Sequence, residues 1–157
     1  MTEPTEPGWR IDALGDRCLM IEFGQRVDPR INEAVHAFAD HLIEHPIAGV
    51  TDIVPAFTTV AVHYRPEAIE PDASIDPPHR RLHRRLAALL AQGVERAARQ
   101  TRVVEIPVCY GGDLGPDLEE VANACALSPD EVIARHAASP HVVYMLGFAP
   151  GFPYMGG

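Results

Sequence analysis

Residues 17–43 read RCLMIEFGQRVDPRINEAVHAFADHLI, and the apolar period within this stretch changes from two to about 3.6 residues. Leu19, Ile21 and Phe23 recur at every second position, as in a half-buried strand. Asp28-Pro29 then opens a helix, because Asp28 can cap free amides and Pro29 fits the first helical position. One apolar stripe follows at helical spacing, formed by Ile31, Val35, Phe38, Ala39, Leu42 and Ile43. The stretch therefore predicts a strand followed by an amphipathic helix.

The same two periods recur downstream. Short strands are expected at residues 50–54 and 57–64, the second with Thr58, Val60, Val62 and Tyr64 on one face. Asp76-Pro77 repeats the cap-plus-proline opening of a helix. Its expected apolar stripe, which has Gly93 inside it, consists of Leu82, Leu86, Leu89, Leu90, Val94 and Ala97.

Two further strands complete the predicted sheet. Residues 102–108 alternate as a strand, and Pro107 places it at an edge or a bulge. Upstream, Gly15-Asp16 forms a two-residue turn between residues 10–14 and 17–23, which predicts a hairpin. From residue 17 to 108 the order is strand, helix, strand, strand, helix, strand. This order predicts an α+β, ferredoxin-like (split βαβ) domain with two helices on one face of an antiparallel sheet.

The composition limits the classes of function. The chain has 157 residues, 46% of them apolar, which is enough for a core. A net charge of −9 argues against nucleic acid or an anionic membrane as the main partner. The acidic, Pro-rich start of the chain does not resemble a signal peptide. Three cysteines without metal-type spacing predict reduced thiols in a cytoplasmic protein, and no metal site is expected.

The character of the chain changes after Cys109. A Gly-rich loop at residues 110–116 precedes a short helix expected at 117–127, with Leu118, Val121, Ala122 and Cys125 facing inward. A capping box at residues 128–131 starts a second helix, and a strand at 141–146 runs into a Gly/Pro/aromatic loop.

His136 and Asp113 are the catalytic candidates. His136 shares a helical face with Val132 and Ile133, and a half-buried histidine can act as acid or base near neutral pH. The alternative is a core histidine bonded to backbone. Asp113 lies in the glycine-rich turn, where a carboxylate can orient a cation, an ammonium group or a water. Nearby acids at 117, 119 and 120 are typical of a helix N-terminus.

Five residues are candidates for substrate binding. Gly111 and Gly112 can let the backbone approach a ligand, although a tight turn explains them equally. Phe148 and Phe152 lie with Gly151 on a Gly/Pro frame and can stack on a small planar ligand or anchor a partner's side chain. The basic run at residues 79–85 can contact an acidic partner, but a solvated helix face is the simpler interpretation.

Several motifs resemble one known family. Residues 106–121 (IPVCYGGDLGPDLEEV), residues 127–132 (LSPDEV), His136 and residues 143–157 (VYMLGFAPGFPYMGG) are similar to the allophanate hydrolase subunit 1 family. Weaker likeness occurs at Gly15-Asp16, at residues 22–24 and at residues 54–57. The resemblance covers roughly residues 10–157.

The resemblance implies a fold. It divides the chain into a flexible tail (1–9), an N-terminal α+β domain (10–101) and a cyclophilin-like β-barrel domain (102–157). Relatives continue beyond the Gly-Gly with strands that close the barrel, so this second domain is expected to be incomplete.

The resemblance also implies a function. The family includes one component of ATP-dependent 5-oxoprolinase, which converts 5-oxoproline to glutamate together with subunit 2 of the same family (a C-type subunit) and a third subunit. ATP is then expected in the complex and not on this chain alone, and the candidate residues are expected to face a partner in a shared pocket. Three alternatives stay open: a non-catalytic regulator that inhibits a histidine kinase, an allophanate hydrolase subunit in urea utilisation, and a fragment with no activity of its own.

Overall fold

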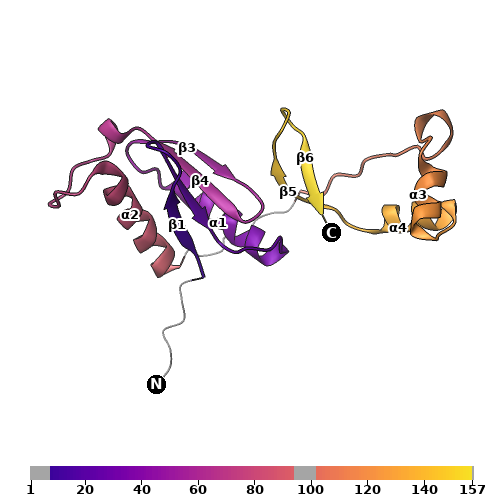
Figure 1. Ribbon diagram of the computed structural model, residues 1–157, viewed down its shortest axis with the longest axis horizontal. Coiled ribbons are helices and arrows are strands. Elements are labelled where there is room, and N and C mark those ends of the chain that lie inside the picture. Colours follow the sequence, from indigo (N-terminus) through magenta and orange to yellow (C-terminus); the bar gives the residue numbers. More distant parts are fainter. Residues whose placement is uncertain (1–7, 94–101, 157) are drawn as a thin grey trace, which may run out of the picture. The chain divides into compact units, whose positions relative to one another are not determined.

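The computed structural model describes residues 8–93 and 102–156 (Figure 1). These residues form two compact units. The first comprises the described residues of Met1–Arg99 together with Tyr144–Tyr154, and the second comprises those of Gln100–Val143 and Met155–Gly157. The domain boundaries expected after residues 9 and 101 stay a prediction. The segment Tyr144–Tyr154, which was expected in the second domain, groups with the first unit. None of the helices in the described ranges has the length and hydropathy that a membrane span requires.

The first unit contains a four-stranded sheet. Its strands are β1 (Arg10–Ala13), β2 (Cys18–Glu22), β3 (Val50–Pro55) and β4 (Thr59–Tyr64), in the order β1-β2-β4-β3. Every neighbouring pair is antiparallel. The predicted hairpin is confirmed, because β1 and β2 pair across the Gly15 turn. The α+β class with an antiparallel sheet is confirmed as well.

The helix α1 (Pro29–Glu44) connects β2 to β3. The Asp28 side chain accepts a hydrogen bond from the Arg30 backbone N–H at 2.7 Å, which confirms the predicted cap. Val35, Phe38, Ala39 and Leu42 are buried as the apolar stripe predicts, whereas Ile43 is 63% exposed. The inclusion of Ile43 in the stripe was therefore wrong, because that position has rotated off the buried face.

The helix α2 (Pro78–Gln92) follows β4 and the short 3₁₀ helix η1 (Pro66–Ala68). It begins one residue later than predicted, with Pro77 as N-cap and no side-chain cap. Its end is also corrected, because the helix ends at Gln92 and Gly93 follows as the C-cap with φ +75°, a positive φ that glycine adopts at little cost. Val94 and Ala97, predicted in the same stripe, lie outside the described residues.

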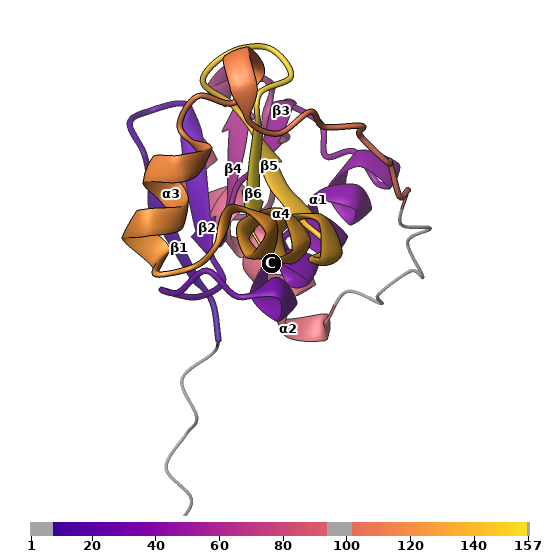
Figure 2. The same ribbon diagram turned by 90° about the vertical axis from the view of Figure 1, so that its right-hand side faces the viewer.

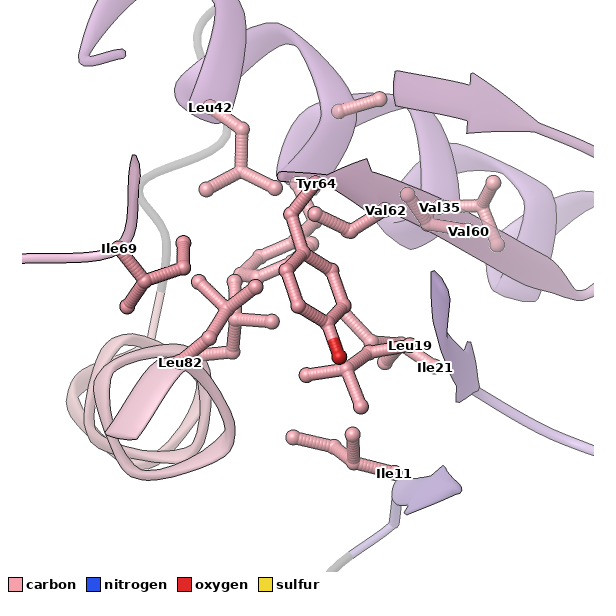
Figure 3. Close-up of a cluster of buried hydrophobic side chains, with 13 residues drawn as sticks. Ile11, Leu19, Ile21, Val35, Leu42, Val60, Val62, Tyr64, Ile69 and Leu82 are labelled. Atoms are coloured by element: carbon pink, nitrogen blue, oxygen red, sulfur yellow. The ribbon is translucent and has the colours of Figure 1, made fainter. Parts of the chain in front are cut away.

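One cluster of apolar side chains forms the core (Figure 3). Both helices and alternate positions of the strands contribute to it, so α1 and α2 cover the same face of the sheet, as predicted. Its buried members are Ile11, Leu19, Ile21, Val35, Phe38, Ala39, Leu42, Val60, Val62, Tyr64, Ile69, Leu82 and Leu86. A fully buried Leu or Phe contributes roughly 1.5–3 kcal/mol through the hydrophobic effect, so this cluster dominates the stability of the unit.

The strand predicted at residues 102–108 does not form. Residues 102–110 carry no regular secondary structure, and Val103 and Ile106 are 84% and 73% exposed. The edge beside β2, which the last strand of a ferredoxin-like sheet would occupy, is taken by β1, with Arg10 opposite Glu22 and Ala13 opposite Leu19. Pro107 also lacks the N–H that a strand ladder needs. Residues 102–108 alternate as a strand does, but β1 occupies the edge of β2 against which they would pair.

The second unit contains the helices α3 (Leu118–Cys125) and α4 (Pro129–Ala138), which pack against each other (orange in Figure 2). The predicted capping box is confirmed: the Ser128 hydroxyl accepts from the Glu131 N–H, and the Ser128 N–H donates to the Glu131 carboxylate at 2.8 Å. Ala122 is buried, whereas Val121 and Cys125 are exposed, contrary to prediction. An eight-residue helix with one neighbour buries only a narrow stripe.

The strands β5 (Val142–Leu146) and β6 (Pro153–Gly156) form a two-stranded sheet. Within residues 102–156 they are the strands that the structure describes, and a barrel is not seen there. The loop between them carries the Gly/Pro/aromatic motif.

Candidate functional site

His136 lies on α4 and its side chain is exposed, not half-buried as predicted. The Tyr110 hydroxyl is 2.6 Å from His136 Nδ1, and the two rings meet edge to face at 5.7 Å. The centroid of the His141 ring lies 5.1 Å from that of His136. When the Tyr110 hydroxyl donates to Nδ1, a neutral His136 carries its proton on Nε2. The Tyr110 hydroxyl can also accept from Nδ1–H, and in both arrangements Nε2 is the ring nitrogen that Tyr110 does not engage.

Asp113 lies in the 3₁₀ helix η2 (Gly112–Leu114) and is exposed. Its carboxylate makes no hydrogen bond or ion pair with another described residue. The structure places Asp113 and His136 in the same unit but gives no contact between them. Glu119 and Glu120 occupy the first turn of α3, where the helix dipole favours acids, so they have a structural explanation.

The glycines of the 111–115 turn are required by the local backbone. Gly111 and Gly112 have φ values of +74° and +59°, and the Gly115 N–H donates to the Gly111 carbonyl at 3.1 Å. A Cβ on Gly115 would lie 2.6 Å from the Gly111 nitrogen. The turn leads into a three-residue 3₁₀ helix without a lysine, so it lacks the features of a phosphate-binding loop.

Phe148, Gly151 and Phe152 are brought together in the β5–β6 loop. The Gly147 N–H donates to the Phe152 carbonyl at 3.1 Å, which closes the loop. Phe148 is 95% exposed and has φ +57°, a conformation that is a genuine outlier for a bulky residue. Its ring meets the Phe152 ring edge to face at 6.2 Å. The backbone thus holds two aromatic rings outward at an energetic cost, as occurs at binding sites.

Two polar side chains of α1 were missed by the sequence analysis. Asn32 is 4% exposed, and its Nδ2 lies 3.1 Å from the carbonyl oxygens of Ala56 and Phe57 and 3.2 Å from that of Tyr144. His36 Nε2 is 3.0 Å from the same Tyr144 oxygen. A signal for Asn32 existed, because it is three residues before Val35 and falls on the same face of the helix.

The basic run at residues 79–85 serves mainly to hold the preceding loop. Arg81 donates to the backbone carbonyls of Ile69, Glu70 and Asp76 at 3.1, 3.2 and 2.6 Å. Arg84 pairs with Asp76 and, at 2.6 Å, with Asp72. These contacts favour the structural interpretation of the run. Asp76, predicted as a helix cap, is instead an ion-pair partner.

Asp72 carries a large pKa shift in this unit. Hydrogen bonds from the Ser74 hydroxyl and backbone N–H, helped by the Arg84 guanidinium, lower the pKa of Asp72 from 3.8 to about 2. A shallow cleft of about 440 Å³ lies beside these charges and is lined in part by His79, Arg80 and His83. Arg84, which also lines it, is already neutralised by its two carboxylates.

The cysteines behave differently from one another. Cys18 is buried in β2, and burial raises the pKa of its thiol, whereas Cys109 and Cys125 are exposed free thiols. Across residues 8–93 and 102–156, no three His, Cys, Asp or Glu side chains gather as a metal site would require.

Comparisons with known proteins support the resemblance found in the motifs. The profile of the carboxyltransferase domain, subdomain C and D, matches residues 9–157. The chain is 44% identical over 151 residues to the 5-oxoprolinase B subunit of Bacillus subtilis (strain 168), covering 95% of this chain and 63% of that protein. It is 33% identical over 144 residues to the 5-oxoprolinase B subunit of Escherichia coli O157:H7, which covers 91% of this chain and 61% of that protein.

A solved structure agrees with these relatives. The crystal structure of TTHA0988 is 36% identical to this chain, with a TM-score of 0.69 over 88% of this chain and 25% of that one. The chain spans about three fifths of the length of the two curated relatives. The family match over residues 9–157 and the similarity to both relatives show that the chain belongs to the carboxyltransferase domain, subdomain C and D, family.

Proposed function

We propose that this chain acts as a B-type subunit of an ATP-dependent 5-oxoprolinase, which hydrolyses 5-oxoproline to glutamate in the cytoplasm. The observation that carries the proposal is the 44% identity to the Bacillus subtilis 5-oxoprolinase B subunit over 95% of this chain. The relatives are named as subunits, so the activity is proposed for an assembly. Its other members would be a C-type subunit of the same family and a third subunit.

The physical chemistry supports an assembly. The amide of 5-oxoproline is stable, and coupling its hydrolysis to ATP supplies the driving force. The glycine turn of this chain does not fit a phosphate cradle, because no lysine follows it and the helical element within it is the three-residue 3₁₀ helix η2. We therefore assign ATP binding to another part of the complex and derive no step from ATP on this chain.

His136 is proposed as the general acid or base. Nδ1 of its exposed side chain lies 2.6 Å from the Tyr110 hydroxyl. When Nδ1–H donates to that hydroxyl, Nε2 can take a proton from an attacking water and then give it to the leaving nitrogen of the ring amide. Asp113 has a carboxylate without a partner among the described residues, so it is available to orient a water or an ammonium group. Gly111 and Gly112 supply a bare backbone beside it.

Phe148, Gly151 and Phe152 are proposed as a binding surface. The two phenyl rings are 6.2 Å apart and largely exposed, and Gly151 (φ +80°) lets the chain turn between them. Such rings can stack on the flat lactam of 5-oxoproline or bury a side chain from a partner subunit. The strained backbone at Phe148 is consistent with a position kept for binding.

The partial cyclophilin-like barrel also remains a proposal. Apolar side chains of residues 102–108 and of β5–β6 are exposed, among them Val104 at 58%, Ile106 at 73% and Leu146 at 61%. Exposed apolar side chains and open strand edges in either segment can mark an interface. Further strands, such as the extra length of the relatives can supply, would cover them.

The proposal is tested by purifying the complete protein with its native partners and assaying ATP-dependent loss of 5-oxoproline. Recovery of a C-type subunit with this activity supports the assignment, whereas recovery of a histidine kinase or a biotin-dependent carboxylase without it would favour the alternatives.

The site assignment is tested separately in the same complex. His136→Ala and Asp113→Asn are expected to reduce kcat by about 100-fold or more, the usual contribution of a positioned acid or base. His79→Ala, an exposed histidine on α2, is the matched control and should leave turnover unchanged. Full turnover in both test variants would refute the site while leaving the subunit assignment intact.

A further inference from the structure

A backbone carbonyl in the middle of β5 receives two donors from α1. Tyr144 O lies 3.2 Å from Asn32 Nδ2 and 3.0 Å from His36 Nε2. A carbonyl oxygen has two lone pairs, so both donors can bind it at once. Because the carbonyl can only accept, His36 must carry its proton on Nε2 in this arrangement.

Asn32 also reaches the turn between β3 and β4. Its Nδ2 is 3.1 Å from the carbonyls of Ala56 and Phe57, so two hydrogens are shared among three acceptors. Asn32 is 4% exposed, where an unpaired amide would be costly. A leucine would continue the apolar stripe of α1 at this position. The polar side chain is explained by the three carbonyls that it joins.

Ring packing holds both strands of the hairpin on the same turn. The Phe57 ring centroid lies 5.8 Å from that of Tyr144 in β5 and 5.9 Å from that of Tyr154 in β6. Tyr144 is 5% exposed. Phe148 follows Tyr144 by four residues and Phe152 precedes Tyr154 by two, so the aromatic loop has little free chain on either side.

We infer that Asn32 and His36 are positioning residues, which fix the Phe148–Phe152 loop through the Tyr144 carbonyl and the β3–β4 turn. All of these groups belong to the first compact unit. The role of the loop in ligand binding rests on the proposed function, whereas its attachment to α1 does not. The hydrogen bonds of Asn32 and His36 go to Tyr144 and, for Asn32, also to the β3–β4 turn, so both residues act on the loop through these groups.

Amide hydrogen exchange of the complete protein tests the attachment. Asn32→Asp keeps the shape and removes the donor, and it turns a carboxylate toward three carbonyl oxygens. Exchange at Gly147 and Phe152 is expected to rise about tenfold, while Ile21 and Val62 in the sheet centre keep their rates. Asn123→Asp makes the same chemical change at an exposed position of α3 and should leave the hairpin unaffected.

His36 gives an independent pair of variants. His36→Phe keeps a ring without the donor and should also speed exchange in the hairpin, whereas His36→Gln retains an N–H at similar reach and should restore protection. This pair also serves if Asn32→Asp does not fold. Unchanged hairpin exchange in His36→Phe, or equal exchange in the Phe and Gln variants, would overturn the inference.

A kinetic readout separates the inference from the proposed function. In the assembled enzyme, a faster-exchanging hairpin with a raised KM for 5-oxoproline supports both. A faster-exchanging hairpin with unchanged KM and kcat confirms the attachment and refutes the binding role of the loop.

Discussion

Gly49 offers a sharp test of the packing in the first unit. It has φ +89°, and a Cβ placed there would lie 2.8 Å from the carbonyl carbon and oxygen of Ala68 and 2.8 Å from a side-chain carbon of Ile69. The Gly49 carbonyl also accepts from the Arg65 N–H at 2.9 Å. Ala68 contributes backbone, not a flexible side-chain end, so the clash cannot be relieved by a rotamer change.

The cost of Gly49→Ala follows from these two features. The left-handed backbone costs a non-glycine residue about 1–2 kcal/mol. Overpacking against the η1 backbone adds about 1–3 kcal/mol. Gly15 is the matched control, because it has φ +72° and open space around its Cβ position, so Gly15→Ala meets only the first cost. Gly49→Ala should therefore be destabilised by about 2 kcal/mol more than Gly15→Ala.

The assay is urea unfolding followed by the fluorescence of Trp9, the single tryptophan of the chain. Trp9 packs against the core of the first unit, so its signal reports that unit. With an m value of about 1–3 kcal/mol/M, the midpoints of the two variants should differ by about 1 M. Equal midpoints would mean that Gly49 is not pressed against Ala68, and the reasoning would be wrong.

Three further predictions concern other elements. Because the pKa of Asp72 is lowered to about 2, its stabilising contacts should be complete above about pH 4 and disappear as the pH falls toward 2. A two-dimensional NMR titration of the loop at residues 66–77 should show this transition in the native chain and not in Asp72→Asn. The same transition in the variant would contradict the prediction. Phe148→Gly should stabilise the protein by about 1 kcal/mol in urea unfolding, because it relieves a positive φ at a side chain that is 95% exposed. The same variant should weaken partner or substrate binding. A loss of stability would show that the backbone at Phe148 is not strained. Ser128→Ala should cost about 1 kcal/mol by removing the α4 capping box, measured by thermal unfolding, with Ser139→Ala at the other end of α4 as a near-neutral control.

The elements of the first unit could be predicted because their signals are local. Alternation at Leu19 and Ile21 and the helical stripe from Val35 to Leu42 each follow from a few neighbouring residues. The capping residues Asp28 and Ser128 were predictable for the same reason.

Strand pairing was harder, because it depends on residues far apart in the chain. Residues 102–108 have the period of a strand, yet β1 occupies the edge beside β2. A hairpin closes its short loop at lower entropic cost than a strand some eighty residues away, and sequence period contains no information about that competition.

In the candidate site, too, residue types could be predicted from local sequence, whereas long-range contacts could not. The Gly/Pro/aromatic loop and His136 could be picked out by residue type, but the partners of each side chain could not. Tyr110 meets His136 across 26 positions, and Asn32 meets Tyr144 across 112. Such contacts exist only once the chain has folded, so the exposure of His136 and the role of Asn32 became visible only in the structure.

We propose that this chain is a working subunit of a 5-oxoprolinase, and deletion of its gene tests that proposal. The most direct measurement follows ATP-dependent conversion of 5-oxoproline to glutamate by chromatography, in extracts with the gene intact, deleted, and restored on a plasmid. We expect conversion to disappear on deletion and to return with the restored gene. Equal conversion in all three extracts would contradict it.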